Sequence, residues 1–244
     1  MPQVRGAVRG LNSTGPALPE SIDAVLFDAG GVLLDLDYDY LRRLIEPVVG
    51  DVTCSVLSQA EAIARREINN NVREGATVAG SWRDYFHIIL GHVRVPGHRH
   101  EALIDSLWEA HHRVGLWTVA CEGAFGVVAT LKRRSLRIGV VSNAEGQVAR
   151  NLEDAGFKGT FETVVDSHLV GVSKPDPAIF SIALERMSLR ADRVVFVGDI
   201  PEVDVSGARA AGIAAVLLDR HDLYSGVDAP RIGSLEELPG LLGL

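Results

Sequence analysis

The sequence predicts an α/β protein, a doubly wound parallel sheet into which a second, all-helical domain is inserted. Short apolar runs alternate with helical stretches along most of the chain, which is the pattern of a parallel sheet covered on both faces. Each of these runs is followed by a polar residue or by a Gly-Asp pair. The segment 37–117 departs from this pattern because its apolar residues keep helical spacing throughout.

Five apolar runs are the expected strands. The first, Ile22–Phe27, leads directly into Asp28 and then a glycine pair, whose backbone freedom lets a ligand approach the chain closely. The others are Arg137–Val141, Thr163–Val165, Val194–Val197 and Ile213–Leu218. Because open α/β sheets bind ligands at the carboxyl ends of their strands, we expect the functional site beside Asp28.

Helical spacing predicts the remaining elements. Between the strands the expected helices are Phe125–Arg133, Gln147–Ala155, Pro177–Met187 and Val205–Ala211. In the middle segment they are Tyr40–Val49, Val56–Asn71, Trp82–His92 and Glu101–Val114, with no strand. The expected organisation is a disordered tail at 1–20, an α/β core at 21–36 and 118–244, and a helical domain at 37–117.

The composition excludes several classes of function. The chain has 47% hydrophobic and 23% charged residues, as ordinary globular proteins do, and a formal net charge of −8. That charge argues against binding to nucleic acid or to an anionic membrane, and no apolar run approaches the roughly 20 residues needed to span a bilayer. The two cysteines fit neither a disulfide framework nor a metal site, which favours a reducing cytoplasm.

Polar residues at the strand ends form a coherent set for processing an anion. They are Asp28, Ser142, Asn143, Asp199 and, shortly after, Asp204, joined by Lys174 on a loop that opens a helix. Carboxylates can hold a hard cation, while a hydroxyl and an ammonium group can hold an anionic substrate.

Four stretches, VLFDAGGVL, VVSNAE, SKPDPAIF and VGDIPEVDVSGARAAG, resemble in order the motifs of the haloacid dehalogenase-like (HAD) hydrolase superfamily, over about Ile22 to Leu218. The resemblance implies a Rossmann-like core whose helical insertion is a cap over the site. It also implies an Mg²⁺-dependent phosphatase that acts on a small phosphorylated metabolite through an aspartyl-phosphate. We expect a monomer or homodimer.

The resemblance also implies a role for each motif residue. Asp28 would be both nucleophile and metal ligand. The other metal ligands would be the carbonyl of Gly30, Asp199 and, directly or through water, Asp204. The substrate would be held by Ala29, Gly30, Ser142, Asn143 and Lys174, of which the last three also belong to the catalytic set.

Gly30 departs from the family pattern, because related phosphatases carry there an aspartate that protonates the leaving oxygen. We weigh three outcomes: an ester with a stabilised leaving group, replacement of the acid by Asp35 or Asp37, or a weakly active or non-catalytic protein that binds phosphorylated ligands. A 2-haloacid dehalogenase is the alternative enzyme, since halide displacement needs no acid. The metal-free dehalogenases, however, carry Ser and Asn where this chain has Gly198-Asp199.

Several side chains of the helical domain are expected to be structural. Trp82, Trp108 and Trp117 should pack the domain and its hinge. His111-His112 should be a solvated pair. Arg65, Arg66 and Arg73 should lie on a solvated face, although one of them could reach the substrate.

Overall fold

The structure is a computed structural model that describes residues 16–76 and 81–244, so most of the predicted tail at 1–20 lies outside it. A six-stranded sheet has the order β5-β4-β1-β6-β7-β8, and all its neighbouring strands are parallel. The strands are β1 (Ala24–Phe27), β4 (Arg137–Ser142), β5 (Thr163–Asp166), β6 (Val194–Gly198), β7 (Ala214–Leu218) and β8 (Arg231–Ile232). The five predicted strands are therefore present, and β8 was not predicted.

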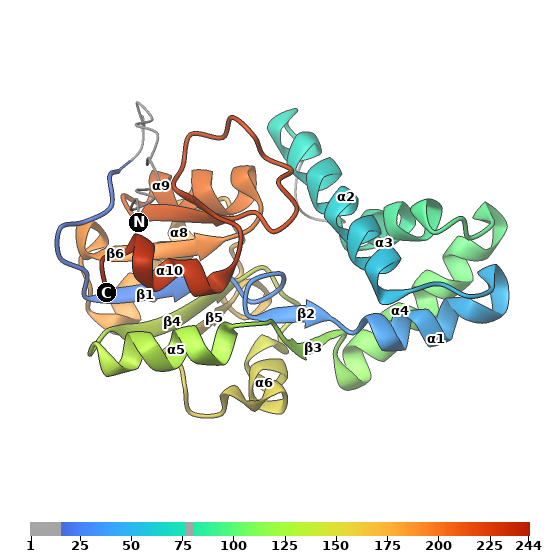
Figure 1. The fold of residues 1–244 in the computed structure, drawn as a ribbon, viewed down its shortest axis with the longest axis horizontal. Coiled ribbons are helices and arrows are strands. Elements are labelled where there is room, and N and C mark those ends of the chain that lie inside the picture. Colours follow the sequence, from blue (N-terminus) through green and yellow to red (C-terminus); the bar gives the residue numbers. More distant parts are fainter. Residues whose placement is uncertain (1–15, 77–80) are drawn as a thin grey trace, which may run out of the picture.

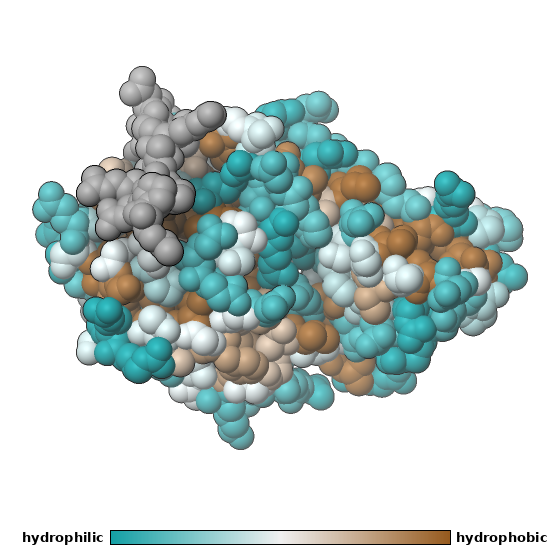
Figure 2. Space-filling view, viewed as in Figure 1, coloured by the Kyte–Doolittle hydropathy of each residue, from teal (hydrophilic) through white to brown (hydrophobic). Residues whose placement is uncertain are grey.

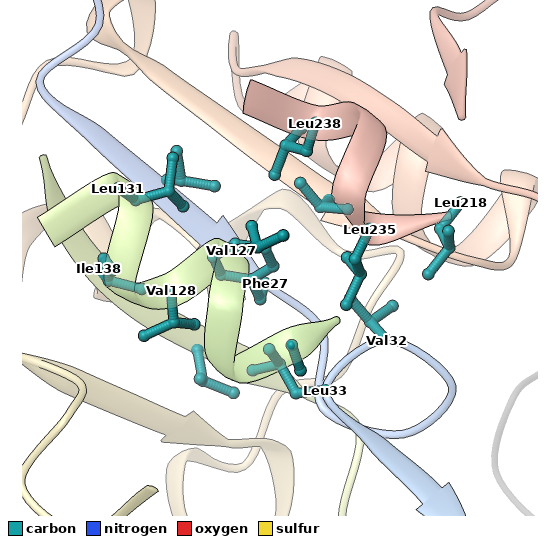
Figure 3. Close-up of a cluster of buried hydrophobic side chains, with 14 of the residues drawn as sticks. Phe27, Val32, Leu33, Val127, Val128, Leu131, Ile138, Leu218, Leu235 and Leu238 are labelled. Atoms are coloured by element: carbon teal, nitrogen blue, oxygen red, sulfur yellow. The ribbon is translucent and has the colours of Figure 1, made fainter. Parts of the chain in front are cut away.

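Helices cover both faces of this sheet (Figure 1). One face carries α5 (Ala124–Arg133), α6 (Val148–Leu152) and α10 (Leu238–Leu241); the other carries α8 (Pro177–Met187) and α9 (Ser206–Ala210). Successive residues of β1 enter opposite cores: Val25 and Phe27 pack under α5 (Figure 3), while Ala24 and Leu26 pack under α8. This confirms the predicted doubly wound sheet.

Shorter helical segments complete the core. They are α7 (Ser167–Val170) and single 3₁₀ or π turns at Gly97–Arg99, Glu153–Phe157, Ala191–Arg193, Pro201–Val205 and Leu235–Glu237. The winding of the chain reverses at β1, because β4 pairs with one of its edges and β6 with the other. Such a reversal opens a crevice at the carboxyl ends of the central strands.

A second unit, which we call the helical unit, consists of α1 (Tyr38–Val49), α2 (Cys54–Arg73), α3 (Ser81–His92) and α4 (His100–Val114). It has its own apolar core and lies beside the sheet domain in Figure 1. An antiparallel ribbon of β2 (Leu34–Leu36) and β3 (Trp117–Ala120) joins the two units. The four helices agree with the prediction to within two residues at each end, whereas the ribbon was not predicted.

Polar residues cover most of the face shown in Figure 2, and the larger brown patches gather over the helical unit at the right. Within the described part of the chain, the structure contains no helix of the length and apolarity that a bilayer crossing requires.

Gly207 brings α9 close to the loop that carries Lys174. A Cβ at this position would lie 2.9 Å from both the carbonyl oxygen of Pro175 and a ring carbon of Phe180. Gly207→Ala should therefore lower the free energy of unfolding by about 1–3 kcal/mol through overpacking.

Gly126 in the exposed part of α5 is the matched control, because a Cβ there meets nothing within 4 Å. Gly126→Ala should raise the stability by about 0.5–1 kcal/mol, since alanine loses less backbone entropy in a helix. Urea unfolding of both variants measures the difference. If both substitutions changed the free energy of unfolding by the same amount, the contact of α9 with Pro175 would not be tight.

Candidate active site

One cavity of about 370 Å³ brings together all the motif residues that were singled out from the sequence. These are Asp28, Ala29, Gly30, Ser142, Asn143, Lys174, Asp199 and Asp204. The cavity lies at the carboxyl ends of β1, β4 and β6, which is the edge where the winding reverses. Its remaining wall comes from loops of the sheet domain, from the β2–β3 ribbon and from α2, α3 and α4 of the helical unit.

Lys174 is the central charge of the site. Its side chain is 1% exposed, and Nζ lies 2.9 Å from Oδ1 of Asp28 and 2.7 Å from Oδ1 of Asp204. The ring of Phe196 lies beneath the ammonium group, with its centroid at 5.3 Å. Burial acts to lower the pKa of Lys174, but the two carboxylates outweigh it and raise this pKa, so the side chain is a fixed cation.

Asn143 holds the backbone of Lys174 in place. Its Nδ2 donates to the carbonyl oxygen of Lys174 at 3.0 Å, and its Oδ1 accepts from the N–H of Lys174 at 2.8 Å. Both ends of this amide side chain are thus engaged in positioning the lysine. Ser142, at the end of β4, is 4% exposed and lines the cavity beside it.

The nucleophile candidate, Asp28, is held at its backbone and its side chain. Its N–H donates to the carbonyl oxygen of Val197 at 2.9 Å, which continues the pairing of β1 with β6. The N–H of Ala29 donates to Oδ1 of Asp28 at 2.7 Å. Oδ1 therefore carries the contacts to Lys174 and Ala29, while no hydrogen bond from a described residue reaches Oδ2.

Asp204 organises the loop after β6. Its Oδ2 accepts from the N–H groups of Asp199 and Ile200 at 3.0 and 2.9 Å, and its Oδ1 binds Lys174. The carboxylate is fully buried. Because both oxygens already have partners, Asp204 orients Lys174 and Asp199 in this structure.

The three acids form a cluster that would suit a divalent cation. One oxygen of each of Asp28, Asp199 and Asp204 lies within 4.8 Å of the other two. Burial raises the pKa of Asp199 to about 7, and the charges of Asp204 and Asp28 add to the rise while Arg65 opposes it. Burial also raises the pKa of Asp28 against the effect of Lys174.

The environment of Asp199 supports the same fit. Its Oδ2 is buried and accepts no hydrogen bond from the described residues, and its charged partner is Nη1 of Arg65 at 3.2 Å. Crowded carboxylates are stabilised by a bound cation, and Mg²⁺ prefers such oxygen ligands. The residues present therefore fit the metal that the sequence implied.

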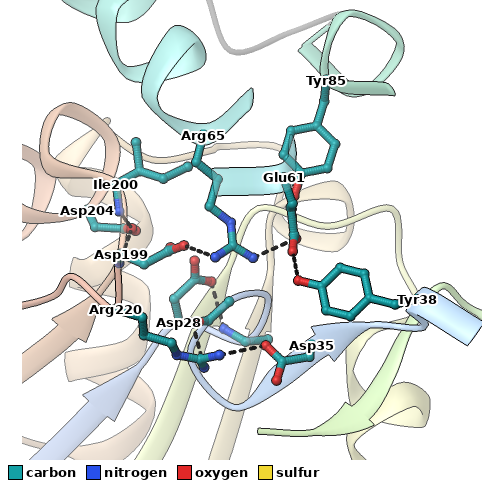
Figure 4. A network of polar contacts seen from close by, with 12 residues as sticks. Asp28, Asp35, Tyr38, Glu61, Arg65, Tyr85, Asp199, Ile200, Asp204 and Arg220 are labelled. Carbon is teal, nitrogen blue, oxygen red and sulfur yellow. Dashed lines mark hydrogen bonds and ion pairs between the residues drawn. The ribbon is translucent and has the colours of Figure 1, made fainter. Parts of the chain in front are cut away.

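Arg65 connects the helical unit to this cluster, which corrects the expectation that it lies on a solvated face. Its side chain is 13% exposed, with Nη1 at 3.2 Å from Oδ2 of Asp199 and Nη2 at 2.6 Å from Oε1 of Glu61. Figure 4 shows Arg65 between these two acids, with the hydroxyl groups of Tyr38 and Tyr85 directed at Glu61. The sequence held a signal for this, since Glu61 and Arg65 interrupt the apolar stripe of α2 at helical spacing.

Neither candidate for a replacement acid, Asp35 or Asp37, lines the cavity, so their positions do not support the replacement of the acid missing at Gly30. Oδ1 of Asp35 lies 2.8 Å from Nη1 of Arg220, which holds it away from the site (Figure 4). Asp37 caps α1 by accepting from the N–H of Tyr40 at 2.8 Å.

Trp117 lies beside the position that a Cβ on residue 30 would occupy. A Cβ on Gly30 would lie 3.4 Å from Cδ1 and 3.5 Å from Nε1 of this indole. Trp117 and Trp82 also pack within the helical unit, as expected from the sequence, and both line the cavity. Space beside Gly30 is thus bounded by an aromatic ring.

His111 is buried, at 3% exposure, so the expectation of a solvated His111-His112 pair is wrong for this residue, while His112 is exposed. Its Nε2 lies 3.0 Å from Oε2 of Glu145, a contact between α4 and the loop after β4. Ile104, Leu107 and His111 share the buried stripe of α4, which was a signal in the sequence. Both His111 and Glu145 line the cavity.

Comparison with known proteins gives the same family as the motifs. The model of the haloacid dehalogenase-like hydrolases matches residues 22–212. The phosphoserine phosphatase of Thermus thermophilus is 32% identical over 187 residues, which are 74% of this chain and 73% of that protein. The haloacid dehalogenase-like hydrolase domain-containing protein 3 of Mus musculus is 30% identical over 191 residues, 75% of this chain and 73% of that protein.

A solved structure supports the fold. The HAD-hydrolase YfnB of Bacillus subtilis, crystallised bound to magnesium, matches with a TM-score of 0.68 and 22% identity, over 92% of this chain and 100% of that one. Together with the family model and the two relatives, the converging motif residues show that the chain belongs to the haloacid dehalogenase-like hydrolases.

Proposed function

We propose that this hydrolase is an Mg²⁺-dependent phosphatase that removes phosphate from a small monoester through an aspartyl-phosphate on Asp28. The observation that carries the proposal is the buried cluster of Asp28, Asp199 and Asp204 around the Lys174 ammonium, at the floor of a cavity. The relative from Thermus thermophilus, named as a phosphatase, supports this type of reaction.

Phosphoryl transfer requires mainly that the protein position the reacting groups and neutralise their charge. Asp28 would attack phosphorus and break the bond to the leaving oxygen, with Lys174 offsetting the repulsion between its carboxylate and the anionic ester. The hydroxyl of Ser142 would hold a phosphoryl oxygen. Mg²⁺, held by Asp28, Asp199 and the carbonyl of Gly30, with Asp204 behind, would neutralise charge on the phosphoryl oxygens.

Gly30 limits the substrates that such a site can process. Glycine offers no proton to the leaving oxygen, and the group beside its α-carbon is the indole of Trp117, which supplies no acid. General acid catalysis is worth about 10²–10⁴-fold. We therefore infer esters whose leaving group is stabilised without protonation, such as aryl, acyl or sugar-one phosphates.

Dehalogenation is the weaker alternative at this site. A metal-free site would have to keep Asp199 and Asp204 beside a nucleophilic Asp28. Beside burial, the charge of Asp204 acts to raise the pKa of Asp28, and the charges of Asp204 and Asp28 act to raise the pKa of Asp199. A cation relieves this repulsion, which favours the phosphatase. If the protein released halide from a haloacid in the presence of a chelator and hydrolysed no phosphate ester, dehalogenation would become the favoured function.

The nucleophile is tested by Asp28→Asn. With p-nitrophenyl phosphate and Mg²⁺, this variant should lose at least about 10³-fold in kcat, because the amide cannot form the acyl phosphate. Asp37→Asn is the matched control: asparagine caps a helix as well as aspartate, so its activity should stay within about twofold of the parent. Equal activity of the two variants would remove Asp28 from the reaction.

Metal binding can be tested without turnover. Mg²⁺ at about 100 times its dissociation constant should raise the free energy of unfolding by about 2.7 kcal/mol. Asp199→Asn should abolish this increase, whereas Asp154→Asn, which alters an exposed acid outside the cavity, should keep it. Thermal unfolding with Mg²⁺ and with EDTA gives the comparison. A metal effect that survives in Asp199→Asn would refute this ligand assignment.

The leaving-group limit is tested by restoring an acid at position 30. The backbone of Gly30 is not in the left-handed region, and a Cβ there makes ordinary contact with Trp117, so Gly30→Asp can be accommodated. This variant should gain about tenfold or more in kcat/KM for an alkyl phosphate and much less for an aryl phosphate. Gly30→Ala adds the same Cβ without an acid and should gain nothing. Equal gains of Gly30→Asp on both esters would contradict the limit.

A further inference from the structure

Aromatic rings line the cavity where the helical unit and the β2–β3 ribbon face it. Tyr85 and Trp117 have their centroids 5.9 Å apart, and Trp82 and Trp117 lie 5.9 and 5.7 Å from the ring of His111. All four residues line the cavity. Because Trp117 lies over Gly30, beside which an ester would release its alcohol, this wall surrounds the alcohol half of the substrate.

One carboxylate stands at this aromatic wall. Glu145 lines the cavity from the loop after β4, and its side chain is 32% exposed. Oε2 binds Nε2 of His111, whereas Oε1 accepts no hydrogen bond from any residue that the structure describes. The side chain is therefore held in place by one oxygen and keeps the other for a ligand.

The position of the hydrogen on the His111 ring decides whether the His111–Glu145 pair keeps a negative charge. Nδ1 of His111 is buried and has no hydrogen-bond partner within the described ranges. A hydrogen on Nδ1 would be a buried donor without an acceptor, whereas a hydrogen on Nε2 is donated to Glu145. We assign the hydrogen to Nε2, so the pair keeps one negative charge.

The other charges at the cavity can be balanced without Glu145. They form one cluster of Asp28, Asp199, Asp204, Lys174, Arg65 and, behind Arg65, Glu61. Four carboxylates face two cations there, so a bound divalent cation would bring the cluster to neutrality. No lysine or arginine of the described chain pairs with Glu145, and an incoming phosphate adds further negative charge.

Aromatic faces and a carboxylate are the groups that bind an alkylated ammonium ion, through the ring quadrupole and through charge. We propose that the substrates are phosphate monoesters with a stabilised leaving group whose alcohol half carries a cationic amine or quaternary ammonium group, seated among Trp82, Tyr85 and Trp117 against Glu145. This inference rests on the proposed phosphatase function and specifies its substrate class. An alcohol half bearing a second anion would be repelled by Glu145.

Two non-hydrolysable phosphonates of equal shape test the proposal. One is 4-(trimethylammonio)benzylphosphonate, which mimics an aryl phosphate with a methylene in place of the ester oxygen, and the other is its uncharged isostere with a carbon in place of the nitrogen. Titration calorimetry in Mg²⁺ should give the cationic ligand an affinity at least about tenfold above that of the isostere. Glu145→Gln, which keeps the shape of the side chain and its contact with His111, should reduce this ratio to about threefold or less.

Glu153→Gln is the matched control, because it removes an exposed acid of the following segment that does not line the cavity, and its ratio should equal that of the parent. A parent ratio near one, tighter binding of the uncharged isostere, no binding of either phosphonate, or an unchanged ratio in Glu145→Gln would each overturn the proposal. Tighter binding of the isostere would instead show a site for neutral apolar alcohols.

A separate assay distinguishes failure of this inference from failure of the proposed function. If the protein hydrolyses p-nitrophenyl phosphate with Mg²⁺ but binds the cationic and the uncharged phosphonate equally well, the proposed phosphatase function would hold and the cationic substrate class would be refuted. Selective binding of the cationic phosphonate by a protein that hydrolyses no ester would refute the phosphatase and keep the cationic ligand.

Discussion

The rest of the site depends on the ammonium group of Lys174, which is buried between the carboxylates of Asp28 and Asp204. Breaking a buried ion pair by removing one partner commonly costs about 3–5 kcal/mol, because the remaining charge has no water around it. The chain therefore holds this lysine from several sides: Asn143 fixes its backbone, and the close approach of Gly207 fixes the loop behind it. The same ammonium group would reduce the electrostatic repulsion between the Asp28 carboxylate and an anionic substrate.

The cavity divides into two halves with different origins. The sheet domain supplies the acids, the lysine and the serine. Asp28, Ser142 and Asp199 lie at the ends of β1, β4 and β6, while Lys174 and Asp204 lie on segments that follow strands, so most of this arrangement follows from the topology of the sheet. The helical unit and the β2–β3 ribbon supply the rings, and the helical unit makes two polar links to the sheet domain, Arg65 to Asp199 and His111 to Glu145. Because the link of Arg65 crosses between the units, the position of the helical unit is coupled to the charge of the acidic cluster.

Sequence patterns predicted the sheet and the motif residues well, because apolar runs of a buried parallel sheet end at its ligand-binding edge. Helix α8 was predicted to the residue, since Asp176 and Pro177 start it clearly. The β2–β3 ribbon was missed because it is very short and pairs segments far apart in the chain. Arg65 and His111 were misassigned because charge was taken as a sign of exposure, although both lie on buried helical stripes.

We propose that Asp28 and Asp199 share a divalent cation while Lys174 stays bound to Asp28. A crystal structure with Mn²⁺ and a phosphoryl analogue tests this most directly, because anomalous scattering locates the metal independently of the refined protein. We expect one anomalous peak bonded to oxygens of both acids, with the analogue between the metal and the Lys174 ammonium. A peak elsewhere, or an Asp28 carboxyl group turned out of the cavity, would contradict it.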